Sequence, residues 1–175
     1  MVTNKGELDA LVGRHPEDDF YLIEYLDYRS ADGLFRKYRF FFVGEEILPY
    51  HLAIGDGWKL HHFRTDMAHN AALQREEEDF LTAPQSVFEP RHFAALGAIR
   101  AALGLEYFGI DCALDRVGRL VVFEANATML CHDQNHALPY KSPAARRVKA
   151  AFGALLARTA GRDVSPARTI ETHPA

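Results

Sequence analysis

The sequence predicts one domain of the α+β class, in which a largely antiparallel sheet packs with helices. Three observations lead to this prediction. The chain has 175 residues, of which 48% are hydrophobic and 25% charged, as in a single globular domain. Short apolar segments occur in pairs around turn-forming residues, which favours hairpins. Segments with helical apolar spacing lie between and after those pairs instead of alternating with every strand.

The N-terminal part should contain one short helix followed by strands. Lys5–Val12 has apolar residues at helical spacing, and Phe20–Leu26 has the aromatic and branched residues of a buried strand. Lys37–Val43 and Ile47–Ile54 surround a short glycine-containing turn and predict a hairpin. Pro49 cannot donate a ladder hydrogen bond, so the second strand should lie at an edge or carry a bulge there.

The C-terminal part should contain three helices and a second hairpin. The segments with helical spacing are Asn70–Thr82, Arg91–Leu103 and Ser142–Arg158. The two strands expected between the last two helices are Tyr107–Leu114 and Arg119–Ala125, joined by a turn over 115–118. Trp58–Phe63 is a further candidate strand. We expect the acidic run Glu76–Asp79 to form a solvated helix face.

The charge balance indicates which partners to expect, and the cysteine count indicates which cellular compartment to expect. With 20 Lys and Arg against 24 Asp and Glu, the net charge is −4, which argues against a nucleic-acid partner. Two cysteines cannot form a disulfide framework, and we find no secretion signal or membrane span, so we expect a cytoplasmic location and no membrane partner. The polar segment 161–175 contains two prolines and is expected to be a disordered tail.

The most informative residues are Asp111, Glu124 and Asn126 in the second predicted hairpin. Glu124 and Asn126 are two apart in one strand and therefore project to the same face. If Leu114 faces Arg119 across the turn, Asp111 opposes Val122 and lies diagonally from Glu124 on that face. Two carboxylates and an amide oxygen are hard ligands that suit Mg²⁺ or Mn²⁺.

These three residues, within YFGIDCALDRVGRLVVFEANAT, resemble the catalytic end of the ATP-grasp superfamily. In that superfamily an Asp, a Glu and an Asn on adjacent strands hold the magnesium ions of bound ATP. The resemblance implies the same metal role for Asp111, Glu124 and Asn126. One departure is Ile110, which stands where ligases of the superfamily often have Arg.

Two earlier segments are similar to other parts of the same superfamily. FYLIEYLDY at 20–28 resembles the hinge strand that reads the adenine edge, which implies that Glu24, Tyr25 and the backbone of Leu26 contact the nucleotide base. Asp32 or Asp27 would then take the ribose hydroxyls. KYRFFFVGEEI at 37–47 resembles the next strand, in which an Arg faces the phosphates. The match there is Arg39, with Arg36 and Lys37 as weaker candidates.

The resemblance also implies how the chain is organised and what it binds. Residues 1–19 would be a remnant of the lid subdomain and 20–160 the C-terminal ATP-grasp subdomain. Lys5 lies in the wrong element to replace the lid lysines that hold the α- and β-phosphates. The expected ligands are ATP, Mg²⁺ (or Mn²⁺) and a small-molecule or peptide carboxylate, activated as an acylphosphate for an amine or thiol. A second copy or a partner subunit could supply the lid.

Two other functions remain open from the sequence. The chain could be a non-catalytic nucleotide-binding or assembly module that kept the fold and lost the lid. Alternatively, a histidine-dependent metal site is conceivable, because His132 and His136 are four residues apart and other histidines precede them. Those in the middle of the chain are His51, His61, His62 and His69. A role for His51 facing a substrate is a further hypothesis.

Overall fold

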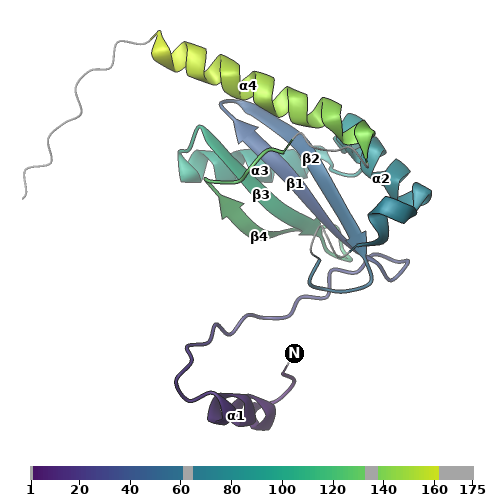
Figure 1. Cartoon of the computed structure of the whole chain (residues 1–175), viewed down its shortest axis with the longest axis vertical. Coiled ribbons are helices and arrows are strands. Elements are labelled where there is room, and N and C mark those ends of the chain that lie inside the picture. The colour runs from purple at the N-terminus through teal and green to yellow at the C-terminus, as the bar shows by residue number, and fades with distance from the viewer. Residues whose placement is uncertain (1, 61–64, 133–137, 162–175) are drawn as a thin grey trace, which may run out of the picture.

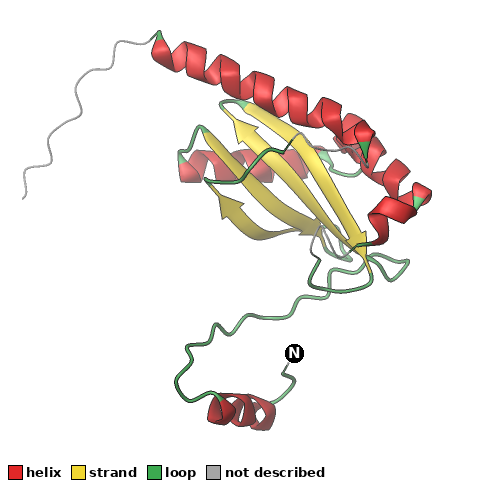
Figure 2. Ribbon diagram, viewed as in Figure 1, coloured by secondary structure: helices red, strands yellow, loops and turns green. Residues whose placement is uncertain are grey.

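The structure, a computed structural model, describes residues 2–60, 65–132 and 138–161. Its centre is a four-stranded antiparallel sheet in the order β2-β1-β3-β4. The strands are β1 (Phe35–Val43), β2 (Glu46–Gly55), β3 (Tyr107–Leu114) and β4 (Leu120–Asn126). Four α-helices and short 3₁₀ turns complete the described part, so the α+β prediction is confirmed (Figure 2).

Three of the four helices described here pack on the sheet, from both of its faces, and the first helix lies away from it (Figure 1). The α-helices are α1 (Lys5–Arg14), α2 (Ala71–Thr82), α3 (Pro90–Leu103) and α4 (Ser142–Ala160). The 3₁₀ turns are η2 (Asp66–His69), η3 (Pro84–Ser86) and η4 (Pro139–Lys141). The predicted helices and both hairpins are therefore confirmed, with ends shifted by a few residues, as is usual for local patterns.

Aromatic residues form the core between the sheet and the helices α2 and α3. Alternate residues of β1, including Phe40 and Phe42, point to this side and are fully buried. They pack against Phe80 of α2 and against Phe88, with ring centroids 5.3 and 5.0 Å from Phe40. Leu96 of α3 closes the same cluster. Area buried by such large rings is the main stabilising contribution in a sheet–helix layer.

The opposite face of the sheet is only partly covered by α4. Phe41 and Val43 of β1 pack under Val148 and Leu155 of this helix. The remainder of the same face, nearer the start of β1, is covered by a small cluster that includes Tyr28. Between these two apolar clusters the sheet presents polar side chains, described below.

The expected properties of β2 are both confirmed. β2 is an edge strand, and its register with β1 shifts where Arg39 pairs with His51 and Phe40 pairs with Pro49. The extra residue, Tyr50, forms the bulge. An edge position and a bulge both accommodate a proline without loss of a ladder hydrogen bond.

The prediction of a strand over Phe20–Leu26 is wrong. These residues have no regular secondary structure, and Tyr21, Leu22 and Ile23 are 95%, 76% and 81% exposed. Figure 1 shows the segment and α1 extending away from the sheet. A strand needs a partner for its backbone groups, and residues 20–26 pair with none of the four strands, so strand propensity alone was insufficient.

For Trp58–Phe63, residues 58–60 form no strand, and 61–63 lie outside the described residues. Residues 162–175 of the expected tail also lie outside the described residues.

Candidate functional site

A row of four polar residues crosses one face of the sheet, one from each strand. His51 on β2 pairs with Arg39 on β1, Arg39 pairs with Asp111 on β3, and Asp111 pairs with Glu124 on β4. Directly paired residues of antiparallel strands project to the same face. His51, Arg39, Asp111 and Glu124, here named the polar row, therefore line up across the full width of the sheet.

The centre of the polar row is an ion pair between a partly buried arginine and a buried aspartate. The Arg39 guanidinium donates two hydrogen bonds to the Asp111 carboxylate, from Nε to Oδ1 at 2.6 Å and from Nη2 to Oδ2 at 2.9 Å. Lys37, two residues before Arg39 on the same face, places Nζ 3.0 Å from Asp111 Oδ2. Asp111 is only 2% exposed. Such a two-pronged pair fixes the orientation of both side chains.

The two cations decide the charge state of Asp111. Burial by itself raises the pKa of the carboxyl group, but the hydrogen bonds and charges of Arg39 and Lys37 outweigh it and lower the pKa below its usual range. For Arg39, burial disfavours the charged form, and the Asp111 carboxylate reverses this effect and raises the pKa. Both groups are therefore ionised at neutral pH.

Glu124 and Asn126 form the open end of the polar row on β4. Glu124 is exposed, and its Oε1 accepts a hydrogen bond of 2.8 Å from Asn126 Nδ2. Asn126 Oδ1 accepts from the backbone N–H and the hydroxyl of Thr128, at 2.8 and 2.9 Å. The amide thus links the carboxylate to the turn that follows β4. Three of the predicted site residues, Asp111, Glu124 and Asn126, lie on one face as expected.

The strand register predicted for this hairpin is wrong, although Asp111 and Glu124 do lie close together on one face, as predicted. Leu114 pairs with Leu120 instead of Arg119, and Asp111 pairs with Glu124 instead of Val122. The turn is one residue longer than predicted, and a bulge at Phe123 shifts the register between Asp111 and Cys112. The bulge brings the two carboxylates into direct opposition, closer than the diagonal arrangement expected from the sequence.

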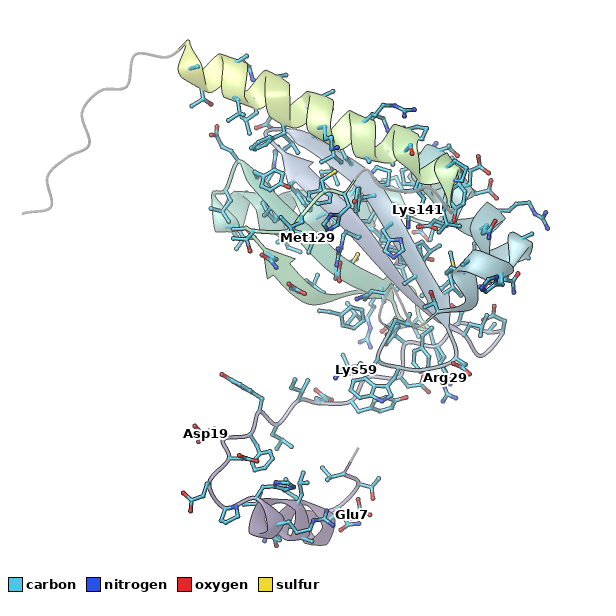
Figure 3. The ribbon with its side chains drawn as sticks, in the orientation of Figure 1. Glu7, Asp19, Arg29, Lys59, Met129 and Lys141 are labelled. Atoms are coloured by element: carbon cyan, nitrogen blue, oxygen red, sulfur yellow. The ribbon has the colours of Figure 1, made fainter. Side chains whose placement is uncertain are left out.

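Two tyrosines hold the segment that follows Asn126. The hydroxyl of Tyr107 donates to the carbonyl oxygen of Met129 at 2.8 Å. The hydroxyl of Tyr50, the bulged residue of β2, donates to the carbonyl oxygen of His132 and accepts from its N–H. Met129 packs over Gly109 beneath α4, where Figure 3 labels it. This segment is therefore anchored to both hairpins.

The residues expected at the adenine and ribose are not brought to the polar row by any contact between described residues. Glu24 lies in the exposed segment, and Tyr25 makes an edge contact with Trp58. Leu26 and Asp27 line a hollow of about 430 Å³ beside Leu120 and Val121. These positions adjoin the β3–β4 turn. The nucleotide-base role of Glu24, Tyr25 and Leu26 stays a prediction.

Both acidic candidates for the ribose are engaged by arginines. Asp32 pairs with Arg36 through two hydrogen bonds of 3.0 and 2.8 Å, and the Arg36 side chain also pairs with Glu76. Asp27 pairs with Arg29 and Arg116. Arg36 therefore faces α2 and does not face the polar row, which leaves Arg39 and Lys37 as the cations there.

A second charged cluster, missed by the sequence analysis, adjoins the polar row at His51. Its members, here named the Glu77 cluster, are His51, Glu77, Tyr140 and Lys141. Glu77 of α2 is fully buried, so the expectation that Glu76–Asp79 is a solvated face is wrong for this residue. Glu77 stands four residues from both Leu73 and Leu81, and this spacing already places it on the buried face.

The histidine metal site receives no support from the described residues. Among residues 2–60, 65–132 and 138–161, no group of three or more His, Cys, Asp or Glu is arranged to hold a metal ion. His132 is exposed. His61, His62 and His136 lie outside the described residues, so that hypothesis stays untested for them.

Comparisons with known proteins identify no family for the chain. Neither the protein-family models, nor the curated proteins, nor the solved structures contain a match to the chain. No helix in the described part of the chain has the length and apolar character needed to span a membrane.

Proposed function

We propose that the polar row is the metal-nucleotide half of an ATP-grasp type site for carboxylate–amine or carboxylate–thiol ligation. The observation that carries the proposal is the register that aligns Arg39, Asp111 and Glu124 on one face, with Asn126 two residues further. Cationic and hard oxygen groups side by side suit a metal-bound polyphosphate, which needs both kinds of partner.

The chemistry of the donor set fits Mg²⁺. Glu124 offers an exposed carboxylate and Asp111 opposes it directly. Asn126 Oδ1, which accepts from Thr128 in this structure, would exchange those hydrogen bonds for the metal to become the third oxygen ligand of the proposed set. Each carboxylate oxygen has lone pairs for more than one partner, so Asp111 can bind a cation while it still accepts from Arg39. A bound Mg²⁺ would neutralise charge on the β- and γ-phosphates. Arg39 would add a fixed positive charge on the same side.

The ligase reaction would need groups beyond those described here. Phosphoryl transfer requires the phosphates to be held in line, and an acylphosphate requires shelter from water. In this proposal a partner subunit or a second copy supplies the lid, and the half-site binds and orients the nucleotide. A reducing, cytoplasmic compartment is part of the proposal, because Cys112 and Cys131 form no disulfide in the described part of the chain.

The test is calorimetric titration of the chain with Mg-ADP, repeated with EDTA. We expect metal-dependent binding in the micromolar to low-millimolar range. Glu124→Gln should weaken it by about ten-fold or more, because the amide is a poor substitute for the carboxylate ligand. Glu78→Gln, an exposed glutamate of α2, is the matched control and should leave affinity unchanged. Equal affinity in Glu124→Gln and the unmodified chain would refute the site.

A second candidate function is a non-catalytic assembly module. It is favoured by the exposed apolar segment Phe20–Leu26, which packs against little of the described molecule. Consecutive exposed apolar residues are characteristic of surfaces that associate with a partner. Light scattering of the full chain and of a chain comprising residues 27–175 tests this function.

A further inference from the structure

The edge strand β4 has an outer side that pairs with no other strand of the described structure. The edge strand at the other side of the sheet, β2, differs from it. β2 carries Pro49 and lies beside α2, where the Glu77 carboxylate accepts from the backbone N–H of Leu52 at 3.0 Å. β4 pairs with β3 alone, and its sequence LVVFEAN contains neither proline nor lysine. Proline, lysine and covering elements are features that keep a sheet edge from pairing with another chain.

β4 also exposes large apolar side chains along this edge. Val122 and Phe123 are 40% and 42% exposed. The bulge at Phe123 increases the local twist of the strand and leaves both side chains uncovered. Leu120 and Val121, at the start of the strand, line the hollow of about 430 Å³ described above. The edge of β4 therefore combines unpaired backbone groups, apolar side chains and open space beside them.

The segment Phe20–Leu26 has the complementary features. It is as long as β4, which has seven residues, and its aromatic and branched residues are those that favour strands. The whole segment is exposed and has no regular secondary structure. One chain thus carries both an unpaired strand edge and an unpaired strand-forming segment. In strand addition, main-chain hydrogen bonds between two such partners supply the affinity.

The direction of the chain leads the segment away from the β4 edge of its own copy. Tyr28 packs against Phe123, with ring centroids 4.9 Å apart, whereas Leu26 borders Leu120, nearer the β3–β4 turn. Followed backward from Tyr28, the chain therefore passes the start of β4, and the segment then extends away from the sheet (Figure 1).

A return of the segment to its own β4 would need a sharp reversal at Asp27. The Asp27 carboxylate lies 2.6 Å from Nη2 of Arg29 and 3.0 Å from Nη2 of Arg116, so ion pairs hold this point of the chain. Residues 24–27 also contain no glycine, the residue that tight reversals favour. The segment of a second copy approaches from outside and meets neither constraint.

We propose that Phe20–Leu26 of one copy adds to the outer edge of β4 of a second copy as a fifth strand, and that the exchange is reciprocal. Each copy then gives one segment and accepts one, so the two junctions are identical and association stops at a dimer. The junctions bury the exposed apolar side chains of both partners. This proposal rests on the assembly function proposed above and specifies the contact through which it acts.

Hydrogen exchange of the full chain at low and high protein concentration tests where the two copies meet. Light scattering follows dimer formation in the same samples. We expect association to slow exchange of amides 20–26 and of the outward amides of β4 by about ten-fold or more, at the same concentration for both sets. Association that protects 20–26 and leaves β4 unchanged would overturn this proposal and leave the assembly function intact. A chain that stays monomeric would refute both.

Two variants alter the edge and the segment separately. Val122→Glu places a charge on the apolar edge of β4, and Ile23→Lys places one in the segment, so each should weaken association by about ten-fold or more. Val117→Glu, at an exposed valine in the β3–β4 turn, is the matched control and should associate like the unmodified chain. Urea unfolding establishes that each variant folds. Unchanged association of folded Val122→Glu would refute the proposal, and the exchange result on the unmodified chain decides the matter if this variant does not fold.

A mixture of the two variants tests the reciprocal exchange. A pair of Val122→Glu copies has two altered junctions, and so has a pair of Ile23→Lys copies. In a mixed pair, the unaltered segment of the first variant meets the unaltered edge of the second, so one junction is intact. We expect the mixture to associate about three-fold or more tightly than either variant alone. Contact between the two segments alone would not produce this gain, and a mixture no tighter than its components would refute the exchange.

Discussion

At the scale of single residues, the Arg39–Asp111 ion pair fixes the side chains at the centre of the polar row. It joins residues 72 positions apart in sequence and fills the centre of the polar row. Removing one member of a buried ion pair leaves the other charge without compensation, and this loss is larger than the net contribution of the pair. Substitution of either residue should therefore change the polar row and also lower the free energy of unfolding.

Asp111→Asn tests this coupling through stability. The variant leaves Arg39 and Lys37 facing a neutral amide, and we expect the free energy of unfolding to fall by about 2–3 kcal/mol. Urea unfolding at neutral pH measures it. Asp9→Asn on α1, whose exposed ion pair with Lys5 has little value, should change stability by less than about 0.5 kcal/mol. Similar changes in the two variants would contradict the assignment.

Glu77 predicts a pH dependence of stability. Burial raises the pKa of this carboxyl group, but His51, Lys141 and Tyr140 more than offset it and lower the pKa from 4.5 to about 2. Because the folded-state pKa lies below the unfolded value, the contribution is complete above the unfolded pKa and is lost as the pH falls toward 2. It corresponds to about 3 kcal/mol.

Glu77→Gln should therefore reduce the free energy of unfolding at pH ~7 by about 3 kcal/mol and flatten its decline between pH ~4.5 and ~2. Chemical denaturation across that pH range provides the measurement. Glu78→Gln, on the exposed side of α2, serves as the control. A decline of unchanged steepness in Glu77→Gln would show that other carboxyl groups dominate acid unfolding.

At the scale of elements, the turn after β4 is fixed by a close approach between Gly109 and Met129. A methyl group at Gly109 would overlap Met129 Sδ and come within 3.0 and 3.1 Å of Cγ and Cβ. Met129 is buried under α4 and cannot retreat freely. The position of Asn126 thus depends on a glycine in the neighbouring strand.

Gly109→Ala should destabilise the fold by about 1–3 kcal/mol through overpacking. In the double variant with Met129→Ala, the total loss should be smaller than the sum of the single losses, because the clash is removed. Thermal or urea unfolding of the four proteins completes the cycle. Gly97→Ala in α3, where a Cβ meets nothing within 4 Å, is the control and should be neutral or stabilising. Strict additivity would contradict the contact.

Local patterns in the sequence predicted most of these elements, and the failures have identifiable causes. Helical spacing and paired apolar segments located α2, α3, α4 and both hairpins, because those signals need no distant partner. Phe20–Leu26 has equal strand propensity but no strand beside it. The β3–β4 register was misjudged because the turn is one residue longer than predicted and because the bulge at Phe123 has no local signature.

The site was predictable only where local sequence patterns determine the direction of a side chain. Asp111, Glu124 and Asn126 could be placed on one face from the period of two in strands. The pairing of Arg39 with Asp111 needed the order of strands, which apolar patterns do not determine. The Glu77 cluster combines residues from β2, α2 and η4, and only the spacing of Glu77 from Leu73 and Leu81 could have signalled its burial.

At the scale of the whole molecule, residues 2–26 make few contacts with the packed domain. No residue of α1 is buried, and Tyr21, Leu22 and Ile23 are largely exposed. Ordered packing begins near Tyr28, which is buried against Phe35 and Phe123. The domain should therefore retain its stability without this segment, while the segment itself favours association.

A chain comprising residues 27–175 tests both statements. Its unfolding midpoint should lie within about 3 °C of that of the full chain, since little buried area is lost. Light scattering should show concentration-dependent association of the full chain that weakens in the shorter chain and in Ile23→Lys. A monomeric full chain at high concentration would refute the assembly function, and a large fall in the midpoint would refute the independence of the segment.

The strand order also has a consequence for the sequence of events in folding. Each hairpin closes locally, whereas pairing β1 with β3 closes a chain segment of about seventy residues, which carries a larger entropic penalty and proceeds more slowly. The polar row takes His51 and Arg39 from one hairpin and Asp111 and Glu124 from the other. The β3–β4 hairpin alone carries the three proposed metal ligands, but Arg39 and Lys37 join them only when β1 pairs with β3, so the row is complete only after the slowest pairing.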